Sequence, residues 1–358
     1  MLPVLSANGS SGYNISRSVR LRSSASAYFS RTFGTPTSNT KYTISLWAKR
    51  GKLGAAQYFG LSYNGASDYT SFYFDANDKL NFTGDSATAG RTFGLTTAAV
   101  FRDPSAWYHV VVVFDSANAT VANRCIIYVN GVSQTLTGTT VPSGIPTYFN
   151  TNGIAVNIGA LNGSNFLDGY LTEINFIDGQ ALTPSSFGST NAVTGVWQPA
   201  KYTGTYGTNG FYLNFSDNSA ATAAAIGKDY SGNGNNWTPN NISVTAGTTY
   251  DSMLDVPTPY ADGGNGRGNY ATWNPLSQTY SLSNKGVASD GNLKYTVPAG
   301  NTSQDYIEAT IPCSQKVYVE LTLGVVGTGG TFVYSGGIAQ TVGTNWTYNS
   351  VAFVNALN

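Results

Sequence analysis

Two carboxyl side chains five residues apart, Glu173 and Asp178, are the first candidates for chemistry in this sequence. A retaining glycosidase needs such a pair, with one carboxylate as nucleophile and the second as acid/base about 5 Å away. Asp178, however, precedes Gly179, and an Asp-Gly pair is typical of a turn in which the carboxylate binds nearby backbone groups. The chain holds only two other glutamates, Glu308 and Glu320, both far along the sequence. We therefore expect a protein that is not an enzyme.

The other residue types that commonly carry catalysis are scarce. His109 is the sole histidine, so neither a histidine-based triad nor a site with several histidine ligands can form. It lies in the apolar segment 107–114, where we expect a packed and hydrogen-bonded role. The glycine-rich stretches lack the Lys-Ser/Thr of a phosphate-binding loop, and no Gly-x-Ser-x-Gly turn has a usable base. Cys125 and Cys313 are isolated, so we expect two buried free thiols in a chain folded in a reducing cytoplasm.

Two clusters mix aromatic rings with carboxamide side chains, a combination that suits sugar binding. A pyranose ring stacks on the flat face of an aromatic ring, while Asn and Asp side chains hydrogen-bond its hydroxyl groups. The first cluster is Asn64, Asp68 and Tyr69, and the second is Asn235 and Trp237. Tyr and Trp also serve as core or rim residues of β-sandwiches, and the sequence leaves this alternative open for both clusters.

The elements that must position these groups are β-strands. Charged residues make up only 10% of the 358 residues, whereas Gly occurs 41 times and Tyr 24 times. Amphipathic helices need Glu, Lys, Ala and Leu, whereas Tyr, Thr and Val favour strands. Apolar and polar residues alternate in most apolar clusters, for example over 42–48. This period of two predicts many short strands separated by turns, as in a sandwich of two antiparallel sheets.

The segment 107–114 is the most apolar run and is predicted to be a central strand. A strand over 124–129 then leads to Asn130-Gly131, the strongest short hairpin signal, because both residues tolerate a positive φ. From the alternation around these segments we predict four buried side chains: Trp47, Trp107, Val111 and Ile126.

Five segments in a fixed order carry a family resemblance. They are 45–47, 107–110, 128–131, 158–159 and 169–174, and they include a Trp-Tyr-His-Val strand, a Tyr-Val-Asn-Gly hairpin and a closing Gly-x-Leu-x-Glu-Ile strand. Together they resemble the laminin-G-like branch of the concanavalin A-like lectin/glucanase superfamily over roughly residues 15–190. The resemblance implies an all-β fold, an antiparallel jelly-roll β-sandwich.

The same resemblance implies two kinds of chemistry. One glucanase branch carries Glu-[Ile/Leu]-Asp-[Phe/Ile]-x-Glu on a strand, and the segment 173–178 imitates this pattern with Asn175 for the central Asp and Asp178 for the last Glu. Laminin-G relatives often bind calcium at a loop edge through Asp and carbonyl oxygens. No spacing singles out a ligand pair here, so calcium is left open among five aspartates on predicted loops or strand ends: Asp68, Asp75, Asp78, Asp115 and Asp168.

Residues 211–217 and 228–238 resemble the strand and the Asp-x-Ser-Gly-Asn-Gly-Asn turn that normally open such a domain, although here they follow it. Because the termini of compact domains often lie close together, a permuted order is physically accessible. We predict that 210–242 form a permuted edge of a sandwich spanning 1–248, with Phe211, Leu213 and Phe215 packed on it. A truncated second copy of the domain is the alternative.

The remainder of the chain is predicted to be a linker and a second module. Pro and Gly signals over 249–268 indicate turns and coil. The segments 269–276, 316–321 and 336–339 then resemble the first part of a SPRY-like β-sandwich, so that 269–358 would be the start of an incomplete second β module. The whole arrangement resembles that of bacteriophage structural proteins.

Charge and hydropathy narrow the choice of partners. The 18 basic and 18 acidic residues form no basic run, which argues against binding to nucleic acid. No apolar stretch reaches the roughly 20 residues of a membrane-spanning helix.

With the resemblance, we expect a non-enzymatic bacteriophage virion-surface protein, a tail fibre or decoration protein assembled in the host cytoplasm. Its partners would be a host cell-surface glycan, other virion proteins and further copies of itself in a homo-oligomer. The alternatives are a purely structural virion component without glycan binding and, third, a glycoside hydrolase.

Overall fold

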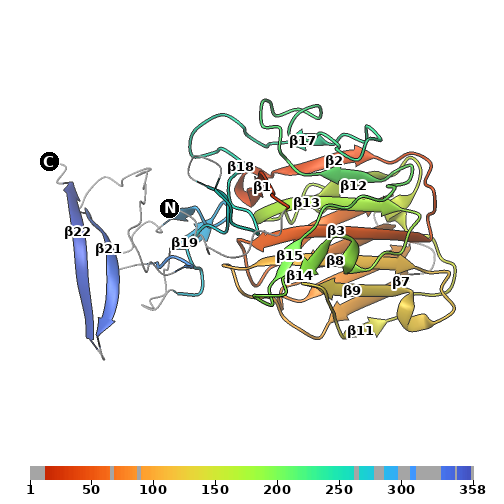
Figure 1. Cartoon of the computed structure of the whole chain (residues 1–358), viewed down its shortest axis with the longest axis horizontal. Helices are drawn as coiled ribbons and strands as arrows, with labels where there is room; N and C mark the ends of the chain where they lie inside the picture. Colours follow the sequence, from red (N-terminus) through yellow and green to blue (C-terminus); the bar gives the residue numbers. More distant parts are fainter. Residues whose placement is uncertain are drawn as a thin grey trace.

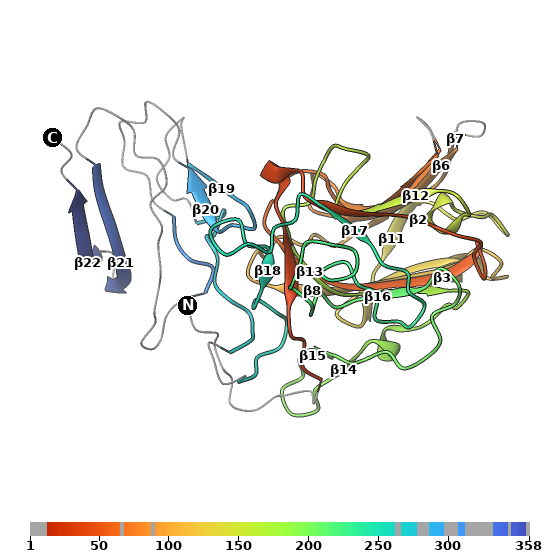
Figure 2. The same cartoon turned by 90° about the horizontal axis from the view of Figure 1, so that it is seen from above.

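The computed structural model describes residues 13–64, 68–86, 90–261, 266–277, 286–296, 307–311, 332–342 and 345–355 (Figure 1). Most of this is a sandwich of two antiparallel sheets, which Figure 2 shows as stacked layers. The predicted all-β fold class is confirmed. Helix is confined, in the described residues, to the 3-10 turns η1 (Ser23–Ala25), η2 (Val121–Asn123), η3 (Tyr148–Asn150) and η4 (Pro184–Ser186). No helix among them is long and apolar enough to cross a membrane.

Sheet A is built around the apolar strand predicted to be central. Its order is β10 (Val132–Ser133), β9 (Cys125–Val129), β8 (Trp107–Asp115), β3 (Lys41–Arg50), β13 (Gly169–Asp178), β1 (Ser18–Leu21) and β18 (Ser252–Met253), and β16 (Phe211–Leu213) also pairs with β13. Asn130 and Gly131 join β9 to β10 with φ values of 49° and 80°. Both angles lie in the left-handed region, which is why this dipeptide predicts a hairpin.

Sheet B packs against sheet A. Its order is β11 (Leu136–Thr139), β7 (Gly90–Thr97), β6 (Leu80–Ser86), β5 (Tyr69–Phe74), β4 (Gln57–Tyr63), β12 (Ala155–Ile158), β2 (Tyr28–Thr32) and β17 (Thr238–Asn240). Alternate side chains of each strand point between the sheets, as the period of two predicts. Phe82 of β6 and Phe93 of β7 meet Phe114 of β8, with ring centroids 6.0 and 5.9 Å apart. These rings join the two sheets in one aromatic core.

Three of the four side chains predicted to be buried are buried: Trp47, Trp107 and Val111 are 4%, 7% and 0% exposed. The prediction was wrong for Ile126, which is only partly buried. Ile126 lies between the buried residues Cys125 and Ile127 on β9, so it points to the outer face of sheet A, where it packs at the margin of a smaller cluster. β9 alternates as predicted, but the side chains that face the core are those of Cys125 and Ile127, and not that of Ile126.

The pairing predicted for residues 210–240 is present. β16 pairs with β13 at Phe211↔Phe176 and Leu213↔Ile174, and β17 pairs with β2. Phe215 contacts Phe29 of β2, with centroids 5.5 Å apart. The segment therefore completes both sheets of one sandwich.

The segment after residue 249 differs from the expected linker. Ser252 and Met253 pair with β1, and Asp251, which is fully buried, accepts hydrogen bonds from Arg20 and Arg22 at 3.1 and 2.8 Å. Pro and Gly mark irregular backbone, but they do not determine whether that backbone is exposed. Here buried ion pairs hold it against the edge of sheet A.

Three further pairs of strands form two-stranded sheets. They are β14 (Gly188–Thr190) with β15 (Trp197–Pro199), β19 (Val287–Ser289) with β20 (Lys294–Thr296), and β21 (Phe332–Val342) with β22 (Asn345–Asn355). The predicted SPRY-like segment 316–321 and Cys313 lie outside the described residues. The SPRY-like module and the domain boundaries stay predictions.

Candidate functional site

The two outer faces of the sandwich differ in what covers them. Figure 2 shows β14 and β15 beyond sheet A, whereas no strand of the described chain lies over the outer face of sheet B. On sheet A, Phe187 packs beside Val111 and Ile177, and Trp197 packs beside Trp47 and Trp107. The covering segment therefore buries most of the aromatic and apolar groups of this face.

His109 lies under this cover in a stack of three rings. Its ring is 4.9 Å from that of Trp47 and 5.9 Å from that of Trp197, centroid to centroid. Trp197 Nε1 donates to His109 Nδ1 at 2.9 Å, which leaves the proton on Nε2, 2.9 Å from Ser45 Oγ. Burial lowers the pKa of His109 to about 3. The ring is thus neutral and fully hydrogen-bonded, as expected of a packed histidine.

Glu173 lies on the same outer face of sheet A and is 5% exposed. A bulge in β13 between Thr172 and Asn175 places it at φ 52°, an unusual backbone angle for a residue other than glycine. The hydroxyl groups of Tyr13 and Tyr212 donate to Oε2 at 2.6 and 2.7 Å. Desolvation raises the pKa of Glu173 to about 7, although both phenols act to lower it. This is a buried acid with two donors.

Asp178 lies on the opposite face of the same strand, at the end of the core. Its carboxylate accepts hydrogen bonds from the backbone N–H groups of Thr37, Ser38 and Asn209 at 2.6, 3.0 and 3.0 Å, and from Asn150 Nδ2 at 2.7 Å. It therefore holds loops together. Glu173 and Asp178 cannot flank one glycosidic bond, because the sheet separates them.

The outer face of sheet B carries three cross-strand rows of side chains. The tyrosines Tyr58, Tyr63, Tyr69 and Tyr73 lie in the two flanking rows and are partly exposed; we call this surface the tyrosine face. One flanking row consists of Tyr58, Tyr73, Asn81 and Thr96. The middle row consists of Asn157, Leu61, Ser71 and Thr83. The other flanking row consists of Ala155, Tyr63, Tyr69 and Asp85. Ser71 and Thr83 are 1% and 3% exposed. The tyrosines are therefore the accessible aromatic groups of this face, beside the partly exposed polar residues Asp85, Thr96 and Asn157.

Tyr58 and Tyr73 form a stacked pair on the tyrosine face, with centroids 4.6 Å apart and planes 16° apart. Burial raises the pKa of Tyr58 to about 12, so its hydroxyl stays a hydrogen-bond donor at physiological pH. Next along the same row, Asn81 donates to Asp75 at 3.0 Å and accepts from Thr96 at 2.5 Å. The stacked tyrosine pair thus lies beside an Asn81 side chain that two hydrogen bonds hold in place.

The structure brings the first predicted cluster together at the rim of this face. Tyr69 lies opposite Tyr63, and the backbone N–H of Asn64 donates to the carbonyl of Asp68 at 2.8 Å. The Asn64 side chain is exposed, and those of Asp68 and Tyr69 are partly exposed. Sequence analysis missed Tyr58, Tyr63 and Tyr73, which belong to the same surface.

The second predicted cluster is buried in the structure. Trp237 is fully buried and its ring lies 4.8 Å from that of Phe211, so it is a core residue. Asn235 is 8% exposed, and its side chain donates to the carbonyls of Thr208 and Gly210 at 2.9 and 2.8 Å. Both residues hold the permuted edge onto the sandwich, and this explains the aromatic and amide mixture in that turn.

The five aspartates left open for calcium have structural partners. Asp78 pairs with Arg50 and Arg102, both at 2.9 Å, and Asp115 pairs with Lys41 at 3.3 Å. The Asp168 carboxylate accepts hydrogen bonds from the Ser23 hydroxyl and from the backbone N–H of Gly291. The Asp75 carboxylate accepts a hydrogen bond from the backbone of its own turn. Asp68 lies close enough to Tyr148 that its charge, together with desolvation, raises the pKa of that tyrosine. In the described part of the chain, no group of three or more His, Cys, Asp or Glu side chains could hold a metal ion.

Residues 23–186, a little under half of the chain, match the family described as the concanavalin A-like lectin/glucanases superfamily. No curated protein matches the chain. Among solved structures, a SAP-like pentraxin from Limulus polyphemus is 17% identical over 52% of this chain and 94% of its own, with a TM-score of 0.37. Domain 4 of an extracellular arabinanase from Geobacillus stearothermophilus, in complex with arabinotriose, is 19% identical over 41% of this chain and 64% of its own, with a TM-score of 0.32. A sialidase CBM40 module from Ruminococcus gnavus, bound to α2,3-sialyllactose, is 15% identical over 37% and 72%, with a TM-score of 0.29.

Proposed function

We propose that this protein binds glycans on the tyrosine face and does not cleave them. The observation that carries the proposal is the set of four partly exposed tyrosines on the one sandwich face that no described strand covers. Aromatic rings offer a flat apolar surface to sugar rings, and neighbouring hydroxyl and carboxamide groups can hydrogen-bond sugar hydroxyls. A superfamily that includes lectins is consistent with this use of a β-sandwich.

The absence of cleavage follows from the placement of the carboxylates. Glycosidases of the retaining type need two of them flanking the scissile glycosidic bond, about 5 Å apart. Glu173 binds two phenols on the outer face of sheet A, whereas Asp178 binds loop backbone on the core side. Neither carboxylate lies on the tyrosine face.

We further propose that the glycan belongs to a host cell surface and that the protein is a bacteriophage virion-surface component, a tail fibre or decoration protein assembled in the host cytoplasm. The resemblance of the chain's arrangement to bacteriophage structural proteins supports this setting. A shallow sugar site gives weak single contacts, and several copies of the chain, held with other virion proteins, would multiply them. This supports a homo-oligomer.

A glycan array probed with the full chain tests the binding. We expect binding to at least one bacterial surface polysaccharide, and loss of it in the double variant Tyr58→Ala/Tyr73→Ala. Tyr202→Ala, on the sheet A side of the sandwich, is the matched control and should bind as the native protein does. Binding that survives the double variant would refute the tyrosine face. A folded native chain that binds no glycan would favour the purely structural virion component.

A turnover assay on the bound polysaccharide tests the second half of the proposal. We expect no products from the native chain. Products that disappear in a Glu173→Gln variant would show that the protein is a hydrolase after all.

A further inference from the structure

Lys49, near the end of β3, is an unusual lysine because its side chain is completely buried. Its Nζ donates to Asp255 Oδ2 at 2.8 Å, to Asn269 Oδ1 at 2.8 Å and to the carbonyl of Tyr270 at 2.5 Å. The two side-chain partners come from the segment that packs on the edge of sheet A after the sandwich is complete. An amine, a carboxyl group and a carboxamide are thus held together away from water.

The amine and the carboxamide are the two reactants of an amide exchange, and the carboxyl group is a proton carrier for it. A neutral amine can attack the carbon of a carboxamide, and the product is a new amide with release of ammonia. The reaction needs a neighbouring acid that takes a proton from the ammonium and later gives one to the leaving nitrogen. Holding the groups in contact replaces a bimolecular encounter by an intramolecular step, and this lowers the entropic part of the barrier.

Asp255 is placed to act as this proton carrier. Oδ2 contacts Lys49, while Oδ1 accepts a hydrogen bond from Trp107 Nε1 at 2.8 Å, which fixes the carboxyl group in orientation. Burial raises the pKa of Asp255, although Lys49 and Trp107 act to lower it. Proton transfer along the 2.8 Å contact would convert a buried ion pair into two neutral groups, which cost less to keep out of water.

Asn269 is placed to be the acceptor. Its Oδ1 lies against Lys49 Nζ, and its Nδ2 donates to the carbonyl of Ser105 at 2.6 Å. The carboxamide is therefore held at both ends, with its carbon beside the amine and its nitrogen, the leaving group, directed to a separate hydrogen-bond partner.

We propose that Lys49 and Asn269 form an intramolecular isopeptide bond, with Asp255 as the proton carrier. The Lys49 Nζ–Asn269 Cγ bond forms and the Asn269 Cγ–Nδ2 bond breaks. The Lys49 ammonium gives up two protons to Asp255 in turn, one before the attack and one as the new amide forms. Both pass to the leaving nitrogen, which departs as ammonium, and no oxidant or reductant is needed. The bond ties the segment around Asn269 covalently to the central strands of sheet A.

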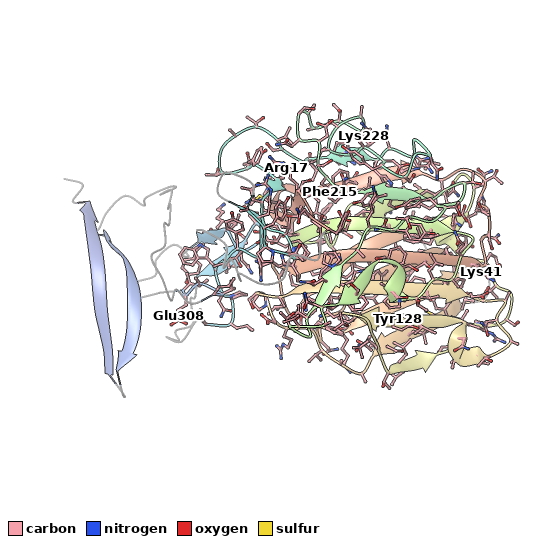
Figure 3. The ribbon with its side chains drawn as sticks, viewed as in Figure 1. Arg17, Lys41, Tyr128, Phe215, Lys228 and Glu308 are labelled. Atoms are coloured by element: carbon pink, nitrogen blue, oxygen red, sulfur yellow. The ribbon has the colours of Figure 1, made fainter. Side chains whose placement is uncertain are left out.

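The lysine at the other end of β3 provides a matched comparison. Figure 3 places Lys41 at the far end of the sandwich from Arg17, the residue beside β18. Lys41 pairs with Asp115 at 3.3 Å, but its side chain is 40% exposed. This side chain remains in contact with water, so the chemistry proposed for the buried Lys49 does not extend to Lys41.

Mass spectrometry of the denatured full chain tests the proposal. We expect the native protein to weigh one ammonia less than its sequence, and tandem spectra of a digest to show the peptides containing Lys49 and Asn269 joined. Asp255→Asn and Asn269→Ala should each give the full mass and separate peptides, whereas Lys41→Met should keep the cross-link.

A native chain of full mass overturns the proposal, and so does a loss of one water with a cross-link to Asp255. Loss of ammonia without joined peptides, as in cyclisation at Asn130-Gly131, also overturns it. The peptide map of the native chain decides the matter even if a variant fails to fold.

Discussion

The outer faces of sheets A and B carry similar residues and differ in their cover. On sheet A, Trp47 and Tyr212 are 4% and 5% exposed. Trp47 stacks on His109, which Trp197 of β15 covers, and Tyr212 donates to Glu173. On sheet B, Tyr58 and Tyr73 stack on each other and remain partly exposed. The comparison shows that an aromatic residue on the outer face of either sheet is accessible only where no later segment of the chain covers it.

The largest expected effect is on the covered face. Trp47→Ala removes a ring that is 4% exposed and stacked on His109, so we expect a loss of about 3–5 kcal/mol in the free energy of unfolding. Tyr73→Ala, on the open face, should cost only about 1 kcal/mol. Urea unfolding of both variants measures the difference, and equal losses would contradict the contrast between the faces.

A pH-dependent effect is expected from Glu173. Its pKa is raised from an ordinary value of 4.5 to about 7, so the stability associated with its protonated form is present below pH 4.5 and is lost as the pH rises through 7. A shift of this size corresponds to an upper limit of about 3–4 kcal/mol. We expect unfolding of the native chain at pH 4.5 and 7.5 to show this fall in stability.

Glu173→Gln should show a smaller fall between the two pH values, because the amide does not titrate. Glu308→Gln, which changes an exposed glutamate, should behave as the native chain does. An identical pH dependence of the native chain and the Glu173 variant would show that Glu173 titrates normally.

A smaller effect is expected on the open face, and it concerns binding. Tyr58→Ala/Tyr73→Ala should weaken binding to the array-selected glycan by at least about tenfold, because truncating an aromatic contact commonly costs about 1–2 kcal/mol of binding. Titration calorimetry measures the change. Unchanged glycan affinity in a variant that retains the fold would show that the binding site does not lie on this face.

The smallest effect is expected at the rim. Asp68→Asn removes a charge from a partly exposed position and keeps the shape of the side chain, so glycan affinity should fall by about twofold or less. Calorimetry under the same conditions measures it. A loss as large as that of the tyrosine double variant would show that the rim, and not the stacked pair, carries the binding.

Local pattern predicted much of the fold. The period of two around 107–114 predicted the central strand, and Asn130-Gly131 predicted the hairpin, because side-chain alternation and positive φ are properties of a few neighbouring residues. The resemblance placed the turn at 229–235 on the sandwich, and the pairing of β16 with β13 agrees. The candidate site was predicted only in part, at Asn64, Asp68 and Tyr69.

What the sequence by itself determined, then, was the strands, their turns and the class of fold, because alternation and turn chemistry are local. Tertiary structure alone decided which aromatic residues are accessible. Tyr58 and Tyr63 are five residues apart and would point to opposite faces of a regular strand, but a bulge between Tyr58 and Gly60 brings them to the same face. Trp237 and Trp47 are buried by segments distant in the sequence. A bulge and a covering segment each depend on contacts with other strands, which no short stretch of sequence contains.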